Sequence, residues 1–137
     1  MSRSNSISRW VSFGPQFHAL LRIVTAFMFM QSGTMKLFAW PMGMPPDNST
    51  AVFGTQIWIG GFLEVFGGLL MLIGWWTRPV AFILAGEMAV AYFQFHQPSG
   101  FWPVENGGVA AVAYCFLFLY YSAAGAGPWS VDAWKSK

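Results

Sequence analysis

Hydrophobic residues gather in four stretches of the chain, at about residues 17–38, 55–76, 80–96 and 109–124. The connections between them hold Pro and Gly, where helix breakers belong. Each stretch is near the roughly 20 residues that a helix needs to cross a bilayer, and the third and fourth are at the short end. This pattern predicts an all-α fold, an integral membrane bundle of four transmembrane helices. Residues 1–137 would form a single membrane domain, with a basic, Ser-rich segment at residues 1–16.

Composition supports a membrane protein. Hydrophobic residues make up 55% of the chain and charged residues only 9%, against roughly 25% charged in soluble domains. So few charges cannot cover a soluble surface, and so much apolar sequence does not stay disordered. The net charge of +2 is too small to indicate nucleic-acid binding.

The basic residues indicate how the chain crosses the membrane. Connections on one side of the predicted bundle hold Asp47 and Glu105 but no Lys or Arg. Most of the Lys and Arg fall on the other side: Arg3, Arg9, Arg78, Lys135 and Lys137. The positive-inside rule therefore places both termini in the cytoplasm. The eight Trp residues fall at the two predicted boundaries, as an aromatic belt would.

Three charged residues lie well inside the predicted membrane layer: Arg22, Glu64 and Glu87. Each costs about 2.5–3.5 kcal/mol to insert, so each needs a partner or a function. Glu64 shares a helix face with glycines, which predicts that it points into a close helix contact. We expect Arg22 to be the nearest cation to Glu64 or Glu87. Two interpretations stay open: a buried polar site, such as a proton relay or headgroup pocket, and structural ion pairs that fix the helix register.

A second polar group is predicted at the outer boundary. Lys36, His96 and Glu105 would converge there. Their surroundings would be aromatic: Trp40, Trp58 and Trp102. A few polar groups in an apolar wall are typical of a small-molecule site. The alternative is that all three are interfacial residues that meet water and headgroups.

The metal-ligating and redox-active side chains are few. Cys115 is the one cysteine, which excludes an internal disulfide and a CxxC pair. With two histidines, His18 and His96, a three-histidine zinc site is excluded too. These histidines fall on opposite membrane faces, a poor arrangement for haem ligation. Catalysis by the isolated chain is therefore not favoured, and no metal or catalytic set is predicted.

Several short motifs, in order and spacing, resemble the DoxX family over nearly the whole chain after Pro15. They are Leu21-Arg22-Ile23, Lys36-Leu37-Phe38, the Gly-rich run from Gly60 to Gly68 around Glu64, Thr77-Arg78-Pro79, the segment from Ala91 to His96, Asn106-Gly107-Gly108 and the closing segment from Gly125 to Asp132. By this resemblance, the positions of interest are Arg22, Lys36, Glu64, Arg78, His96 and the Asn106-Gly107-Gly108 turn. Relatives commonly have Glu where this chain has Val109. If that Glu contributes to an outer site, either Glu105 substitutes for it or the site is altered in this chain.

The resemblance implies a small multi-pass protein of the bacterial inner membrane. Some relatives are linked to membrane oxidoreductase systems, including a thiosulfate–quinone oxidoreductase subunit. The expected function is therefore a membrane subunit or accessory of a redox system, with quinone as the candidate cofactor. The alternatives are a non-catalytic module that stabilises a larger complex and a small transporter. Expected partners are the lipid bilayer and either further copies of the chain or a larger membrane complex.

Overall fold

The computed structural model describes the backbone of residues 2–137 and the side chains from residue 4 onward. Every regular element in this range is helical, which confirms the all-α prediction. The helices are α1 (Ser2–Val11), α2 (Gly14–Phe38), α3 (Gln56–Ile73), α4 (Thr77–Ala91), the π-helix η1 (Tyr92–His96), the 3-10 turn η2 (Gln97–Ser99), α5 (Pro103–Asn106), α6 (Val109–Ala124) and α7 (Val131–Lys135).

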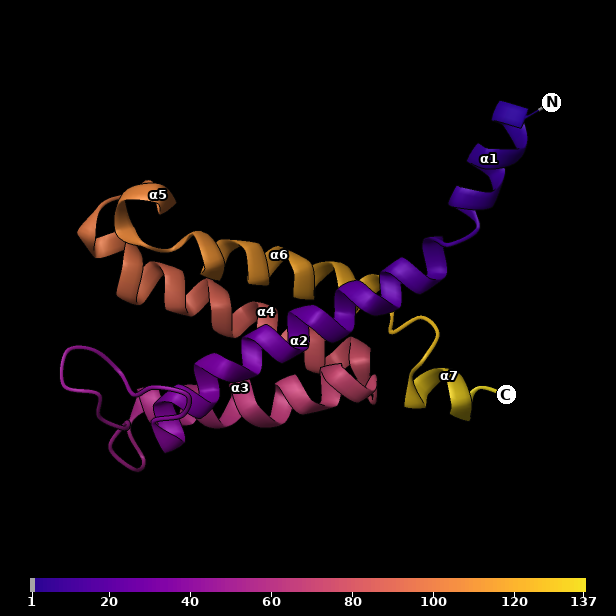
Figure 1. Cartoon of the computed structure of the whole chain (residues 1–137). Coiled ribbons are helices and arrows are strands. Elements are labelled where there is room, and N and C mark those ends of the chain that lie inside the picture. Colours follow the sequence, from indigo (N-terminus) through magenta and orange to yellow (C-terminus); the bar gives the residue numbers. More distant parts are fainter. Residues whose placement is uncertain (1) are drawn as a thin grey trace.

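The long helices form two closely packed pairs (Figure 1). α2 packs along α3, and α4 packs along α6. A tight turn at Gly74 joins α3 to α4, where a left-handed backbone conformation at Gly74 ends α3. We call the end of the molecule that carries α1 and α7 the terminal end. The opposite end, which carries residues 39–55 and α5, is the loop end.

The predicted segments correspond to α2, α3, α4 with η1, and α6. Two regions differ from what the pattern indicated. The Ser-rich segment forms α1, which extends away from the other helices (Figure 1). The third stretch ends in a π-helix rather than a regular α-helical turn. Such wide turns are rare and often lie at functional sites.

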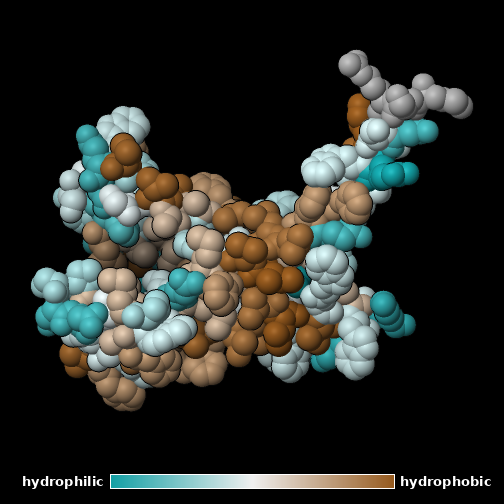
Figure 2. Space-filling view, in the orientation of Figure 1, coloured by the Kyte–Doolittle hydropathy of each residue, from teal (hydrophilic) through white to brown (hydrophobic). Residues whose placement is uncertain are grey.

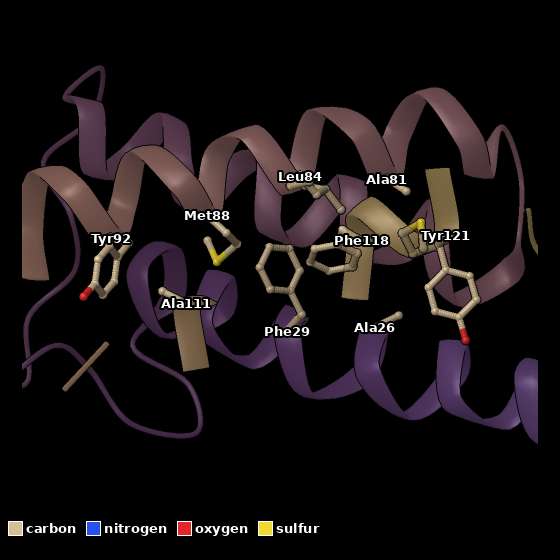
Figure 3. Close-up of a cluster of buried hydrophobic side chains, with 11 residues drawn as sticks. Ala26, Phe29, Ala81, Leu84, Met88, Tyr92, Ala111, Phe118 and Tyr121 are labelled. Carbon is tan, nitrogen blue, oxygen red and sulfur yellow. The ribbon is translucent and has the colours of Figure 1, made fainter. Parts of the chain in front are cut away.

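A buried core joins the two pairs (Figure 3). Phe29 of α2 packs edge-on against Phe118 of α6, with ring centroids 4.8 Å apart. Leu84 and Met88 of α4 complete the cluster between them. Since large apolar side chains fill the space between the pairs, they hold the long helices in a fixed arrangement.

Glycines bring α2 and α3 unusually close. A Cβ atom at Gly33 would lie 2.8 Å from the carbonyl oxygen of Gly61, and one at Gly61 would lie 3.0 Å from Cβ of Lys36. Small residues allow such close packing in membrane proteins. Glu64, one turn after Gly61, is buried in this contact, so the prediction that it points into a close helix contact is confirmed.

The outer surface is strongly apolar. Figure 2 shows hydrophobic residues gathered over the middle of the molecule and polar residues at its two ends. Among the described residues, only α3 (Gln56–Ile73) is long and apolar enough to cross a membrane by itself, and α6 is a shorter apolar helix. Exposed aromatic side chains such as Phe27, Phe82 and Phe116 extend the apolar surface over α2, α4 and α6.

Candidate functional site

Arg22 lies at the terminal end, fully buried, and its partners are backbone carbonyls. Its Nε donates to Met71 O at 3.0 Å, and its Nη2 donates to Trp129 O at 2.7 Å. Its Nη1 donates to the carbonyl oxygens of Ala126 and Pro128. The predicted pairing of Arg22 with Glu64 or Glu87 is therefore wrong. The cause is the chain between α6 and α7, which folds under the helices and presents carbonyls that no helix satisfies.

Asp132 fixes this closing segment to the start of α4. Its carboxylate accepts hydrogen bonds from the backbone N–H groups of Trp76 and Thr77, both at 3.0 Å. Burial raises the pKa of Asp132, but the hydrogen bonds from Thr77 and Trp76 and the charge of Arg22 outweigh it, so the pKa is lowered overall. His18 adds a further link, with Nε2 2.9 Å from Gly125 O. Arg78 donates to Ala123 O. Arg22, Asp132 and Arg78 are thus all hydrogen-bonded at the terminal end, where two neutral groups, Trp75 Nε1 and Thr77 Oγ1, are buried without a partner among the described residues.

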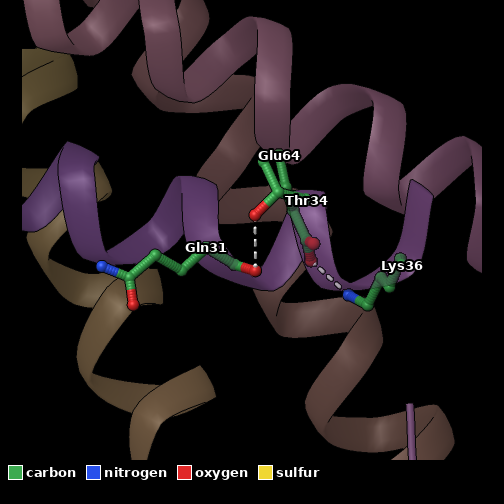
Figure 4. Close-up of polar contacts among 4 residues, drawn as sticks. All are labelled: Gln31, Thr34, Lys36 and Glu64. Carbon is green, nitrogen blue, oxygen red and sulfur yellow. Dashed lines mark hydrogen bonds and ion pairs between the residues drawn. The ribbon is translucent and has the colours of Figure 1, made fainter. Parts of the chain in front are cut away.

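The loop end holds a buried ion pair between α2 and α3 (Figure 4). Lys36 Nζ lies 2.6 Å from Glu64 Oε1. The Glu64 side chain is 2% exposed and that of Lys36 is 21% exposed. Because glycine occupies position 61, the stem of Lys36 can pass close to α3 and reach the carboxylate. Sequence analysis placed these two residues in separate groups, and the structure brings them together.

Glu87 joins this pair from α4. One of its carboxylate oxygens, Oε1, lies 3.3 Å from the place of a Cβ atom at Gly60, so the side chain points toward α3. There its carboxyl group interacts with Glu64 through charge and a side-chain hydrogen bond, and with Lys36 through charge. Oε2 of Glu64 and Oε2 of Glu87 are both buried, and no other described residue donates a hydrogen bond to them. Such groups are rare in native structures and call for an explanation.

These groups line a cavity of about 640 Å³ between α3 and α4, closed on one side by α2. Figure 2 shows the surface hollowed at this loop end. Its lining comes from α2, the loop, α3, α4 and η1: Met35, Lys36, Met44, Pro45, Gln56, Ile57, Gly60, Glu64, Glu87, Val90, Ala91, Phe95 and His96. Most of the wall is apolar, and the charged groups sit at its inner side.

The π-helix supplies the wall on the α4 side. It places Phe95 and His96 on the cavity, and His96 Nδ1 lies 3.1 Å from the carbonyl oxygen of Asn106. The Asn106 side chain holds its own turn, donating to Gly100 O at 2.7 Å and accepting from Gly108 N at 2.8 Å. The Asn106-Gly107-Gly108 motif therefore positions His96.

Two glutamines bridge the helices beside the cavity. Gln56 Nε2 donates to Gln94 Oε1 at 2.6 Å, and Gln94 Nε2 donates back to Gln56 Oε1 at 3.0 Å. Sequence analysis missed this pair, although Gln94 falls on the same face of its helix as Glu87. Gln56 precedes the apolar run of α3 and carries no signal of its own.

The remaining predicted site residues lie elsewhere. Glu105, Trp40 and Trp102 are exposed and do not line the cavity. Trp58 packs between the rings of Phe53 and Phe62. Val109, at the start of α6, is exposed as well. The structure thus joins Lys36 and His96 of the predicted outer group with Glu64 and Glu87 of the buried group, and separates both from Arg22.

Comparison with known proteins identifies the family. The DoxX family model matches residues 17–97, which include most of α2 and the whole of α3, α4 and η1. An uncharacterized protein of Haemophilus influenzae is 42% identical over 123 residues, which cover 88% of this chain and 91% of that protein. No solved structure matches the chain. The motifs, the family match and this relative agree, and the chain belongs to the DoxX family.

Proposed function

We propose that this DoxX-family membrane protein crosses the bacterial inner membrane four times, through α2, α3, α4 with η1, and α6. The terminal end would face the cytoplasm. Arg9, Arg78 and Lys135 lie at or near this end, whereas the connections at the loop end carry Asp47 and Glu105. This charge asymmetry, together with the apolar surface over the middle of the molecule, supports the topology.

Cysteine labelling tests this topology. Single cysteines at Asp47 and Ser136, in a chain whose Cys115 is replaced by Ala, would be exposed to a membrane-impermeant maleimide on intact cells. The loop-end position should react and the Ser136 position should not. Labelling of Ser136 from outside would contradict the proposed orientation.

We further propose that the cavity at the loop end binds the head of a quinone-type lipid, and that the protein is a membrane subunit or accessory of a redox system. The observation that carries this proposal is the cavity itself. Its volume falls within the range of about 300–1,000 Å³ typical of small-molecule sites, and an apolar wall surrounds a few converging polar groups. The free oxygens of Glu64 and Glu87 would accept hydrogen bonds from a head that carries hydroxyl groups, and Lys36 is the donor that a carbonyl group of the head would use.

A cavity-filling variant tests the site without removing its charges. Ala91 lines the cavity, so Ala91→Trp should block it. Gly86 lies on the same helix facing open space, so Gly86→Trp is the matched control. In lipid nanodiscs, decylubiquinone should bind to the parent protein and to Gly86→Trp but not to Ala91→Trp. Equal binding by all three would place any quinone outside this cavity.

The alternative is a non-catalytic module that stabilises a larger membrane complex. The many exposed aromatic side chains on the lipid-facing helices favour it, because they could pack against other transmembrane helices. Purification in mild detergent followed by native mass spectrometry separates the two functions. Bound quinone supports the redox function, and a large complex without any quinone supports the module. The same spectrum would report copies of the chain in a homo-oligomer.

A further inference from the structure

We propose that the cavity selects the reduced, hydroquinone form of its ligand: an amphiphile whose head offers two hydroxyl donors and whose tail is apolar. This inference rests on the proposed quinone-type ligand and adds which form the site prefers. It follows from the hydrogen-bonding character of the polar groups that face the cavity.

The first observation is the pair of carboxyl oxygens without partners. Oε2 of Glu64 and Oε2 of Glu87 are both buried, and Glu64 is almost completely so. Glu87 and Glu64 are joined by a side-chain hydrogen bond, which takes one proton between them, and the remaining carboxyl oxygens can only accept. A buried acceptor without a donor costs about 1–3 kcal/mol, and more when charged. A ligand that brings hydroxyl donors would remove this cost.

The second observation concerns His96, which also lines the cavity. Its Nδ1 faces the carbonyl oxygen of Asn106 at 3.1 Å. Because a carbonyl oxygen can only accept, Nδ1 carries the hydrogen, which leaves Nε2 as the position that can accept a hydrogen bond from a ligand. His96 therefore adds an acceptor to the cavity. If the two carboxyl groups share one proton, one free carboxyl oxygen and His96 Nε2 still remain for two hydroxyls.

The third observation is that Lys36, the cation at the cavity, already has a hydrogen-bond partner. Lys36 Nζ donates to Glu64 Oε1 at 2.6 Å. A quinone carbonyl would have to compete with this carboxylate for Lys36, and its two oxygens would otherwise face acceptors. A hydroquinone has the complementary pattern, since its two O–H groups meet the acceptors and leave the ion pair intact. A ligand whose acceptor atoms lie opposite acceptor atoms of the site binds much more weakly than one that brings donors.

The test compares three ligands with the same tail: decylubiquinol, decylubiquinone and the dimethyl ether of the quinol, which has no hydroxyl donors. Anaerobic binding to the full-length protein in nanodiscs gives each dissociation constant. We expect the quinol to bind at least about 10-fold more tightly than the other two, since a hydrogen bond to a charged group contributes about 1.5–3 kcal/mol. Ala91→Trp should abolish binding of the quinol.

Two variants localise the preference. Glu64→Gln replaces a carboxylate oxygen with an amide N–H donor and should reduce the preference for quinol to within about threefold. Glu105→Gln changes an exposed carboxylate outside the cavity and should retain the full preference. The comparison of ligands on the parent protein decides the question even if Glu64→Gln does not fold.

The outcomes separate the two proposals. Equal or tighter binding of quinone, still blocked by Ala91→Trp, would overturn the preference and leave the quinone site standing. Equal binding of the quinol and its dimethyl ether would also overturn it, because the hydroxyl donors would then contribute nothing. Failure of all three ligands to bind would overturn the quinone site itself.

Discussion

Arg22 and Lys36 are both cations on α2, about 21 Å apart along the helix axis at 1.5 Å per residue, and the protein uses them differently. Arg22 is surrounded by carbonyl oxygens of α3 and of the chain after α6, which together accept from all three of its nitrogens. Lys36 has one carboxylate partner, beside a cavity where two further carboxyl oxygens have none. Where the fold satisfies a buried charge completely, the charge is structural. Where the fold leaves buried hydrogen-bond acceptors without donors, the arrangement is suited to a ligand.

The largest expected effect is at the terminal end. Arg22→Ala would leave the carbonyl oxygens of Ala126, Pro128 and Trp129 without their donor, and the free energy of unfolding should fall by about 3–5 kcal/mol. Unfolding in mixed detergent micelles with increasing dodecyl sulfate measures it. Arg78→Ala, at an exposed side chain that donates to Ala123 O, should cost less than about 1 kcal/mol. Equal losses would mean that Arg22 does not hold this end together.

At the loop end a double-mutant cycle measures how strongly Lys36 and Glu64 are coupled. Lys36→Met leaves two buried carboxyl groups without their cation and should cost about 1–3 kcal/mol. Lys36→Met combined with Glu64→Gln should cost less than the sum of the single changes, because neither charge is then left alone. The same unfolding assay applies. Strict additivity would show that the ion pair contributes nothing beyond its separate charges.

The glycine contact between α2 and α3 keeps Lys36 opposite Glu64. A methyl group at Gly33 would meet the backbone of α3 at 2.8 Å, so Gly33→Ala should separate the helices and cost about 1–3 kcal/mol. Gly86→Ala is the control, since it adds a methyl group in open space and should stabilise α4 by up to about 1 kcal/mol. A thermal scan in detergent would compare them, and similar melting temperatures would contradict the close contact.

The smallest expected effect is at Asp132. Asp132→Ala removes an acceptor from the start of α4 and should cost about 0.5–2 kcal/mol. The pKa of Asp132 is lowered in the folded protein, so its stabilisation is complete above the ordinary Asp pKa of about 3.9. It is lost as the pH falls through the lower folded value. Melting temperatures between pH 7 and pH 3 should therefore fall more for the parent than for Asp132→Asn. Parallel curves would show that the carboxylate contributes nothing.

The hydrophobic pattern was sufficient to predict the four long helices, because long apolar runs between Pro and Gly have few other structures open to them. The pattern was not sufficient to predict the hydrogen-bond partners of Arg22. The partners of Arg22 are backbone carbonyls of a loop, and every residue has a carbonyl, so no side-chain pattern identifies them. The positions of Arg22, Glu64 and Glu87 along their helices suggested that Arg22 was their nearest cation. Such positions do not show which backbone carbonyls lack a hydrogen-bond donor.

The cavity could be predicted only in pieces. Lys36, Glu64, Glu87 and His96 were all recognised as unusual residues for their positions. Position along the predicted helices put Lys36 at the membrane boundary and Glu64 near the middle. Such a position counts Cα atoms only and ignores the reach of a long Lys side chain past Gly61. The π-helix that carries His96 and the bridge between Gln56 and Gln94 come from tertiary packing, which the hydrophobic pattern does not record.

The Arg22 network also bears on how the protein is made. Arg22 is synthesised early, yet three of its acceptors lie 104 to 107 residues further along the chain. The Arg22 guanidinium therefore lacks these three partners until the helices that follow α2 have been synthesised. The terminal end can therefore close only after residues 126–129 have been made, and a chain truncated before Ala126 would leave the Arg22 guanidinium with Met71 O as the one remaining acceptor of its four carbonyl partners.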